Sequence, residues 1–307
     1  MMRICIIGGT GQQGYEQVIA SLEHGYHVTA IGQSRSKERQ ERLTSEKLEW
    51  RQANLSSASE VELALEGADY LFINMPSSSF NDEDILLTMF DNLLEAAQKN
   101  NLKKIIFNTS MYVGEEPIAF QAPKVRRLMI NRLKQASCPH VTVKPVIYMD
   151  NLLTAWTLPN LVKHRIFRYP HHEDLDVSWI SLRDVAQIML TLIKHEAFDG
   201  KELTIGGPES LKGPEIANHL SNALGHQIEF QSMPISEFGQ IMANLFADKN
   251  TYDAEKLSAE LVKVYSWYNT SPLEPFKVDM AILFETLNIK PTYFKDWAQQ
   301  IDWENIQ

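Results

Sequence analysis

The sequence predicts an α/β protein, with a Rossmann-type doubly wound parallel sheet and a smaller, mostly helical C-terminal lobe. Short apolar segments alternate with helical segments through the first half of the chain, and these apolar segments are not broken by regularly alternating polar residues. Strands that are apolar on both faces are typical of parallel sheets covered by helices on both sides. A glycine-rich turn follows the first apolar segment, which is the second observation behind this prediction.

The first half contains six candidate strands with helical segments between them. The strands are expected at Arg3–Ile7, His27–Ile31, Leu48–Ala53, Tyr70–Asn74, Lys104–Asn108 and Val141–Pro145. The helices are expected near Gln12–His24, Ser36–Ser45, Ser59–Leu65, Asp82–Asn100 and Lys124–Ala136. Ligands of open parallel sheets bind at the carboxyl ends of the strands. The polar residues Asn108, Thr109 and Ser110, which end one of these strands, are therefore of interest.

The pattern is less regular after Pro145. Short strands are expected at Ser178–Ile180 and Leu203–Ile205, and helices at Leu182–Lys194, Pro214–Leu224, Ile235–Phe246, Ala254–Val264 and Phe276–Leu287. No repeat or low-complexity linker separates the two halves. We therefore expect a first domain of residues 1–150 and a second lobe of residues 151–307, which binds a substrate or partner and packs tightly on the first.

Composition excludes several classes of function. The chain has 29 basic and 39 acidic residues, a net charge of −10, and an acidic surface of this kind disfavours nucleic-acid binding. No apolar run approaches the roughly 18 residues of a membrane span, so no membrane association is expected. Cys5 and Cys138 share no motif spacing and are expected to be reduced packing residues, which is typical of a soluble, cytoplasmic protein.

The glycine-rich turn is the strongest functional signal. It follows a predicted strand directly and opens a predicted helix, and it comprises Gly8, Gly9, Thr10, Gly11, Gln12, Gln13 and Gly14. Glycines at this spacing allow a tight turn, a close approach of the backbone to a pyrophosphate, and close packing of helix and strand. The turn therefore predicts a dinucleotide site, with phosphates at the helix N-terminus. A purely structural glycine turn is the alternative.

The end of the second strand indicates which dinucleotide is bound. A site for NAD usually offers Asp or Glu about 20 residues beyond the glycines, where it binds the ribose 2′-hydroxyl. This sequence has no acid there and instead offers Arg35 and Lys37. A guanidinium binds a 2′-phosphate well, so NADP(H) is favoured. The alternative is that these are solvated charges at the start of the next helix.

These segments resemble the NmrA-like group of atypical short-chain dehydrogenases/reductases over nearly the whole chain. The glycine-rich turn looks like the fingerprint of the family, and Asn54-Leu55 is similar to its Asp-Leu pair beside the adenine, with Asn in place of Asp. Lys144–Asn151 and Trp179–Ala186 resemble two later family segments. The cofactor site implied comprises the glycine-rich turn together with Arg35, Asn54, Leu55, Met75 and Lys124.

The catalytic segment departs from the usual short-chain reductase pattern of a Ser followed by Tyr-x-x-x-Lys. Ser110 occupies the place of the Ser, whereas Phe120 and Lys124 stand where the Tyr and the Lys belong. Phe has no transferable proton, so ordinary ketone chemistry loses its general acid. The resemblance implies the same, because NmrA-like members commonly lack the Tyr and retain the Lys. Ser110 and Lys124 are the candidate catalytic residues, with Ser110 stabilising developing negative charge and Lys124 holding the ribose; a strand-end hydrogen bond and a solvated cation are the alternatives.

The function predicted is an NADPH-dependent oxidoreductase that transfers a hydride to a small quinone-like or aromatic acceptor. The alternative is a catalytically inactive NADP(H) sensor that acts through a protein partner, and a third hypothesis is an assembly protein that binds no ligand. The second half is rich in aromatic residues, which line an acceptor pocket or form core: Trp156, Trp179, Tyr265, Trp267, Tyr268 and Trp297. No metal site is expected at His171–Asp174, because adjacent side chains point apart and no second ligand pair has helical spacing.

Overall fold

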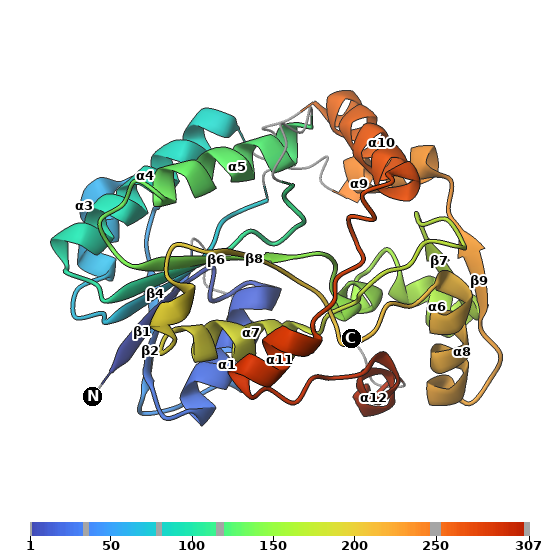
Figure 1. Ribbon diagram of the computed structural model, residues 1–307, viewed down its shortest axis with the longest axis horizontal. Helices are drawn as coiled ribbons and strands as arrows, with labels where there is room; N and C mark the ends of the chain where they lie inside the picture. Colours follow the sequence, from blue (N-terminus) through green and yellow to red (C-terminus); the bar gives the residue numbers. More distant parts are fainter. Residues whose placement is uncertain (1, 33–36, 78–81, 115–119, 246–252, 304–307) are drawn as a thin grey trace. The chain divides into compact units, whose positions relative to one another are not determined.

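The computed structural model of the chain describes residues 2–32, 37–77, 82–114, 120–245 and 253–303 (Figure 1). Its main sheet has seven strands: β1 (Arg3–Ile7), β2 (His27–Gly32), β3 (Leu48–Gln52), β4 (Tyr70–Asn74), β5 (Lys104–Asn108), β6 (His140–Pro145) and β8 (Glu202–Ile205). Their order is β3-β2-β1-β4-β5-β6-β8, and the pairs among β1 to β6 are parallel. The predicted Rossmann-type α/β class is confirmed.

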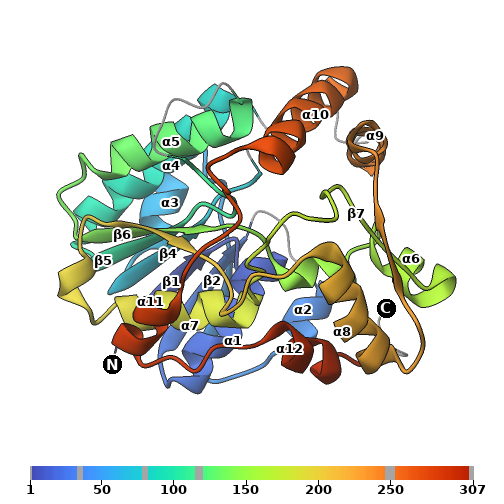
Figure 2. The same cartoon turned by 45° about the vertical axis from the view of Figure 1, so that its right-hand side comes forward.

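Helices cover both faces of this sheet. They are α1 (Gln12–Glu23), α2 (Lys37–Arg42), α3 (Ala58–Ala64), α4 (Glu83–Lys99), α5 (Gln121–Leu133) and α7 (Leu182–Leu192). Figures 1 and 2 show α3, α4 and α5 together on one face and α1 and α7 on the other. The connection from β1 to β2 carries α1 on one face of the sheet, and the connection from β3 to β4 carries α3 on the other face. Strand β1 therefore lies between two neighbours, β2 and β4, that the chain reaches over opposite faces. A sheet of this topology opens a crevice at the carboxyl end of β1.

Burial explains why the apolar segments became strands. Ile4 and Ile6 of β1 are fully buried, and Phe107 of β5 packs on Phe90 of α4 with ring centroids 4.9 Å apart. Burying a side chain of this size contributes roughly 1.5–3 kcal/mol, so each sheet face is held by its helices. Asp82 fixes the start of α4 because its carboxylate accepts hydrogen bonds from the backbone N–H groups of Asp84 and Ile85.

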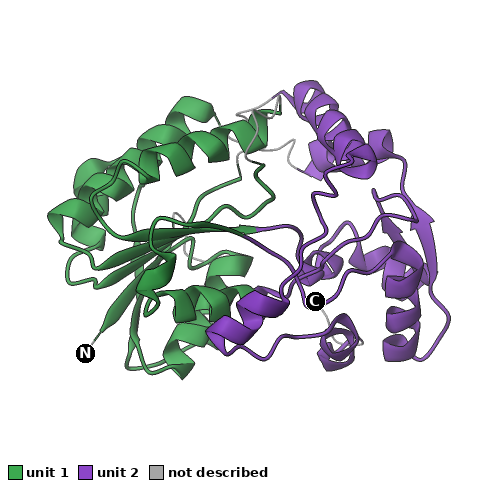
Figure 3. Ribbon diagram, in the orientation of Figure 1, with its two compact units in different colours: residues 1–144, 185–203 green, residues 145–184, 204–307 purple. Residues whose placement is uncertain are grey.

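The chain forms two compact units (Figure 3). Unit 1 comprises residues 1–144 and 185–203, and unit 2 comprises residues 145–184 and 204–307. These units differ from the continuous ranges 1–150 and 151–307, because most of α7 and the start of β8 return to the first unit. The assignment of a cofactor domain and a substrate lobe stays a prediction.

Unit 2 contains short elements around a two-stranded parallel sheet. Its strands are β7 (Ile166–Tyr169) and β9 (Glu229–Ser232), and its 3-10 helix is η1 (Met149–Leu153). Its α-helices are α6 (Leu158–His164), α8 (Gly213–Leu224), α9 (Ile235–Leu245), α10 (Ala254–Thr270), α11 (Ala281–Leu287) and α12 (Phe294–Gln300). The sequence analysis missed β7, β9, α6 and α12. None of the helices in the described residues is long and apolar enough to span a membrane.

Two expected elements of the second half are wrong for one physical reason. The predicted strand Ser178–Ile180 contains a single isolated bridge, from Ile180 to Tyr148, and the predicted start of a helix at Phe276 is displaced to Ala281. The backbone N–H of Ser178 donates to the carbonyl of Phe276, and the hydroxyl of Ser178 accepts from the N–H of Val278. These bonds hold both segments extended against each other without a continuous ladder.

Candidate functional site

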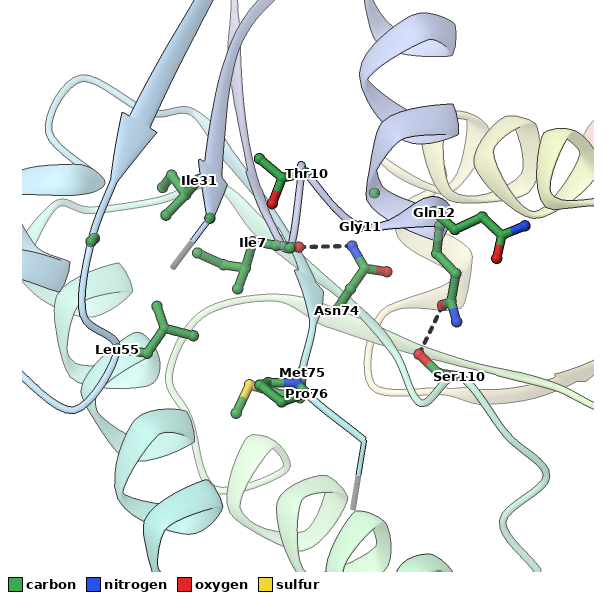
Figure 4. A pocket seen from close by; sticks show the side chains of 15 residues that line it. Ile7, Thr10, Gly11, Gln12, Ile31, Leu55, Asn74, Met75, Pro76 and Ser110 are labelled. Carbon is green, nitrogen blue, oxygen red and sulfur yellow. Dashed lines mark hydrogen bonds between the residues drawn. The ribbon is translucent and has the colours of Figure 1, made fainter. Parts of the chain in front are cut away.

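A pocket of about 340 Å³ lies at the carboxyl ends of the central strands of unit 1 (Figure 4). It is formed where β1, β2, β4 and β5 end and α1 begins, which is the crevice that the topology predicts. The residues that line it are Ile7, Gly8, Thr10, Gly11, Gln12, Gln13, Gly14, Ile31, Gly32, Ala53, Leu55, Asn74, Met75, Pro76 and Ser110.

Three of the four glycines of the turn, Gly8, Gly11 and Gly14, are glycine for different structural reasons. Gly8 has a φ of +73°, which only glycine adopts without strain. A Cβ on Gly14 would lie 2.2 Å from the carbonyl oxygen of Gly8, so a side chain there would force α1 away from the turn. A Cβ on Gly11 would approach that oxygen only to 3.1 Å. The fold therefore requires Gly14 far more strictly than Gly11, and Gly11 borders the pocket.

The turn presents the N-terminus of α1 to the pocket. The Gly11 N–H donates to the Gly8 carbonyl at 2.8 Å, which closes the turn, and Gly11 is the N-cap of the helix. No side-chain hydrogen bond caps this end, and the first turn carries no acidic residue. A helix start of this kind favours an anion, because its backbone N–H groups and its dipole point toward the ligand.

Three buried carboxamide side chains are joined by hydrogen bonds next to the turn, and one of them, that of Asn74, lines the pocket. Gln17 of α1 and Asn74 at the end of β4 make a reciprocal pair, with N···O distances of 2.9 and 2.7 Å. Asn74 Nδ2 also donates to the carbonyl of Ile7 at 2.9 Å (Figure 4). Asn108, at the end of β5, donates through Nδ2 to Asn74 Oδ1 at 3.1 Å. Three uncharged side chains thus join α1, β1, β4 and β5.

The same chain of hydrogen bonds continues to Ser110. Asn108 Nδ2 donates to Gln13 Oε1 at 2.9 Å, and the Ser110 hydroxyl donates to that same oxygen at 2.8 Å. Asn108 Oδ1 accepts from the backbone N–H of Ser110 at 2.9 Å. This bond holds Ser110 in the left-handed region at a φ of +63°, a conformation that costs a non-glycine residue on the order of 1 kcal/mol.

The pocket brings together most of the residues predicted for the cofactor. Gly8, Thr10, Gly11, Gln12, Gln13 and Gly14 line it, together with Leu55, Met75 and Ser110. Asn54 does not line it: this exposed residue uses its Oδ1 to accept a hydrogen bond from the Ser56 N–H. Arg35 lies outside the described residues. Their roles in binding and catalysis stay predictions.

Lys124 lies apart from the residues that line the pocket. Its side chain is 54% exposed, and Nζ lies 3.3 Å from Oε2 of Glu83, the first residue of α4. Lys124 lies one helical turn after Phe120, since the Lys124 N–H donates to the Phe120 carbonyl, and the alignment of this pair with the Tyr and Lys of short-chain reductases stays a prediction. The expected helix start at Lys124 is wrong, because α5 begins at Gln121 and contains Pro123 in its first turn.

Arg39 is a basic residue that the sequence analysis did not single out. It belongs to α2, and its Nη1 donates to the carbonyl oxygen of Thr10 at 2.6 Å. Its Cζ lies 5.4 Å from the centre of the Tyr15 ring. A guanidinium therefore lies beside the glycine-rich turn. The sequence contained one signal for Arg39, namely a second arginine four residues after Arg35.

The described residues that line the pocket offer no side chain for acid–base catalysis. Among the described residues that line it, none is Asp, Glu, His, Lys, Arg, Cys or Tyr. Its polar groups are the backbone of the turn, one Thr, two Gln, one Asn and one Ser. The site can bind and orient a ligand through hydrogen bonds, but these residues cannot donate a proton at neutral pH.

Aromatic side chains form a separate cluster inside unit 2. The ring of His171 lies 4.6 Å from that of Tyr169 and 5.3 Å from that of Phe276, and Trp179 and Tyr265 also pack on it. Burial lowers the pKa of His171 to about 3, so the ring is neutral at physiological pH. His172 is exposed, and the described residues contain no group of three His, Cys, Asp or Glu side chains gathered to hold a metal.

Comparison with known proteins gives a family match and several distant relatives. The model of the NmrA-like family matches residues 1–298. The NAD(P)H azoreductase of Xenophilus azovorans is 23% identical over 252 residues, which cover 82% of this chain and 84% of that protein.

Solved structures of two further proteins share the fold. The NADPH-dependent quinone oxidoreductase of Escherichia coli, solved with NADPH, has a TM-score of 0.73 and 17% identity, and the similarity covers 96% of this chain and 98% of that one. NmrA, a negative transcriptional regulator solved with NADP, has a TM-score of 0.72 and 18% identity, with 99% of each chain covered.

Proposed function

Because the chain belongs to the NmrA-like family, we propose that it is an NADPH-dependent oxidoreductase that transfers a hydride to a small quinone-like or aromatic acceptor. The observation that carries the proposal is the pocket at the glycine-rich turn, whose described lining residues include no titratable side chain. The azoreductase and the quinone oxidoreductase among the similar proteins support this class of reaction.

The residues of the pocket fit a dinucleotide. An uncapped helix start at Gly11, which lines the pocket, suits a pyrophosphate. The apolar wall formed by Ile31, Ala53 and Leu55 suits an adenine ring. Ser110 and Met75 lie at the ends of β5 and β4, where the nicotinamide half would be held. When bound, NADPH supplies the hydride.

The uncharged walls favour acceptors that need no proton from the enzyme. Reduction of a simple ketone develops an alkoxide and gains from a general acid, whereas a quinone or a conjugated dye spreads the charge over its ring system. Phe120 stands where a short-chain reductase has its Tyr and offers no proton. We therefore expect activity with quinones or dyes and little with simple ketones or alcohols. Phe120→Tyr is expected to introduce weak ketone reduction, measured by NADPH oxidation.

NADP(H) is preferred over NAD(H) in this proposal. No carboxylate lines the described pocket, and Arg39 places a guanidinium beside Thr10. We expect Arg35→Glu to reduce the preference at least tenfold, measured as the ratio of the Kd values for NADPH and NADH. Arg39→Ala is the companion variant. If neither variant changes the ratio, these arginines do not bind the 2′-phosphate.

A pair of glycine variants tests whether the turn binds the cofactor. Gly11→Val places a branched side chain at the pocket and is expected to weaken NADPH binding at least 100-fold while the protein stays folded. Gly14→Ala is expected to lower the melting temperature, since its Cβ would clash with the Gly8 carbonyl. Calorimetric titration and thermal unfolding separate the two effects. A folded Gly11→Val protein with unchanged affinity would mean that the turn is only structural.

A catalytically inactive NADP(H) sensor is the second candidate. The ion pair of Lys124 with Glu83 favours it, because the ammonium expected to hold the ribose is engaged by a carboxylate. NmrA, a regulator solved with NADP, is one of the structurally similar proteins. Tight NADPH binding without turnover of any acceptor in a panel of quinones, azo dyes and triarylmethane dyes would favour the sensor over the enzyme.

A further inference from the structure

We propose that Gln13 is a positioning residue that fixes the Ser110 hydroxyl as a hydrogen-bond acceptor toward the ligand, so that this end of the pocket selects a ligand carrying an N–H donor. In the proposed function, on which this inference rests, that donor is the primary carboxamide of the nicotinamide. Ser110 then recognises the cofactor and does not stabilise negative charge on the acceptor, contrary to the role expected from the sequence.

The direction of every hydrogen bond in the carboxamide chain is set by two backbone groups. The carbonyl of Ile7 can only accept, so the group that Asn74 presents to it is the NH2, and Asn74 Oδ1 is left to accept. The N–H of Ser110 can only donate, so Asn108 presents its oxygen to Ser110. Asn108 Nδ2 must then donate in its other direction.

The same reasoning determines the orientation of the Gln13 carboxamide and the donor role of the Ser110 hydroxyl. Asn108 Nδ2 has two hydrogens, and its acceptors are Asn74 Oδ1 at 3.1 Å and Gln13 Oε1 at 2.9 Å. The atom of Gln13 at this point is therefore its oxygen, which carries no hydrogen. The Ser110 hydroxyl lies 2.8 Å from that oxygen and has to donate to it. Its hydrogen is thus directed into the protein.

Because the hydrogen of the Ser110 hydroxyl is directed toward Gln13, the lone pairs of its oxygen face the pocket. Ser110 lines the pocket and is only partly buried (Figure 4). Its position is rigid, because the bond from its N–H to Asn108 Oδ1 holds the backbone at a φ of +63°. A ligand carbonyl or oxyanion meets lone pairs at this point and is disfavoured. A carboxamide NH2 meets an acceptor and is favoured.

Whether the Ser110 hydroxyl acts as donor or acceptor toward the ligand can be tested by comparing the binding of two dinucleotides. The probes are NADP⁺ and its 3-acetylpyridine analogue, in which a methyl group replaces the NH2 while the carbonyl is kept. The wild-type protein is expected to bind NADP⁺ about three- to tenfold more tightly, the size of one hydrogen bond between neutral groups. Ser110→Gly removes the hydroxyl without strain at this positive φ and is expected to bring the ratio of the two Kd values close to one.

Gln13 variants test the positioning role. Gln13→Met keeps the side-chain length but removes the acceptor, so the hydroxyl can turn and donate to the ligand carbonyl, and the ratio is expected to fall toward one. Gln13→Glu keeps an acceptor at this point and is expected to preserve the ratio even if its charge weakens both affinities. Gln12→Met, on the same turn, is the matched control and should change both Kd values in parallel.

The outcomes separate this inference from the proposed function. Binding of both dinucleotides with a ratio that Ser110→Gly and Gln13→Met leave unchanged would overturn the inference alone. Binding of neither dinucleotide by the folded wild-type protein would overturn the proposed function and the inference with it. A ratio lost in Ser110→Gly and Gln13→Met but kept in Gln13→Glu is the result expected, and a purely structural role for Gln13 would not produce it.

Discussion

Two clusters of polar side chains in unit 1 join its strands and helices in opposite ways, one without charge and one through ion pairs. The carboxamide chain at the pocket is uncharged, and its side chains are joined by hydrogen bonds that each match a donor with an acceptor. The second cluster is ionic: the carboxylate of Glu202 in β8 is held by Arg127 of α5 at 2.7 Å, by Lys134 at 2.7 Å and by Lys144 of β6 at 3.0 Å. One cluster borders the ligand pocket, whereas the other ties β6 and β8 to α5.

The difference between the ionic cluster and the uncharged cluster shows that this fold uses charge in a framework contact and neutral side chains at the pocket. Ionic groups bind each other strongly but change state with pH, so the Glu202 cluster suits a framework contact. Carboxamides keep the same donors and acceptors at every ordinary pH, so the chain from Gln17 to Ser110 presents the same pattern to a ligand throughout. In the proposed function, the pocket would select its ligand through hydrogen bonds that do not depend on pH.

Neutralising Glu202 is the largest change expected. Glu202→Gln leaves Arg127, Lys134 and Lys144 without their carboxylate, and Lys144 is almost fully buried. We expect the free energy of unfolding to fall by about 3 kcal/mol, measured by urea denaturation. Lys134→Met removes the more exposed partner of the same carboxylate and should cost less than about 1 kcal/mol. Equal losses in both variants would contradict this view of the cluster.

The same cluster predicts a pH dependence. Burial alone raises the pKa of Glu202, but hydrogen bonds from Lys134, Arg127 and Lys144 outweigh burial and lower the pKa to about 2. The unfolded chain has the ordinary value of 4.5. The contribution of Glu202 to stability is therefore complete above pH 4.5 and is lost as the pH falls from 4.5 toward 2. Glu202→Gln should flatten the stability profile in this range.

Breaking the carboxamide chain is expected to cost less and to be independent of pH. Asn108→Ala leaves the Ser110 N–H, Gln13 Oε1 and Asn74 Oδ1 each short of one hydrogen bond, which should cost about 2 kcal/mol. The loss should be the same at pH 4 and pH 8 in urea denaturation. Asn100→Ala, at the end of α4, removes an asparagine outside both clusters and is the control. If the loss of unfolding free energy in Asn108→Ala varied with pH, the carboxamide chain would not differ from the Glu202 cluster in its pH dependence.

The two clusters also show what the sequence could and could not predict. The glycine-rich turn is local, so its spacing and its place after an apolar strand were enough to place the pocket. Asn74 and Asn108 are the last residues of two predicted strands, and parallel pairing makes them direct neighbours in the sheet. They could therefore have been paired from the sequence. Gln13 could not, because it reaches Asn108 across 95 residues and only the packing of α1 defines that contact.

The limits in unit 2 have a similar cause. Strands β7 and β9 pair across more than 60 residues and are only four residues long, so neither has a periodic pattern of its own. Helix α12 is seven residues long, and Phe294, Trp297 and Ala298 are its buried positions. Such short elements are stabilised by tertiary contacts rather than by local propensity.

The smallest effect expected concerns Lys124, the lysine predicted to hold the ribose of the cofactor. Its exposed ion pair with Glu83 is worth less than about 1 kcal/mol, so Lys124→Met and Glu83→Gln should both leave stability nearly unchanged. Their effects on the cofactor should differ. We expect Lys124→Met to weaken NADPH binding roughly fivefold, because the ammonium would turn from Glu83 to the ribose hydroxyls, whereas Glu83→Gln frees the ammonium and should leave affinity equal or higher. Calorimetric titration of the two variants at constant ionic strength measures this difference. If Lys124→Met binds NADPH as the wild type does, Lys124 serves only the surface ion pair, and cofactor recognition among the described residues of unit 1 rests on uncharged side chains and on Arg39, which donates to the Thr10 carbonyl.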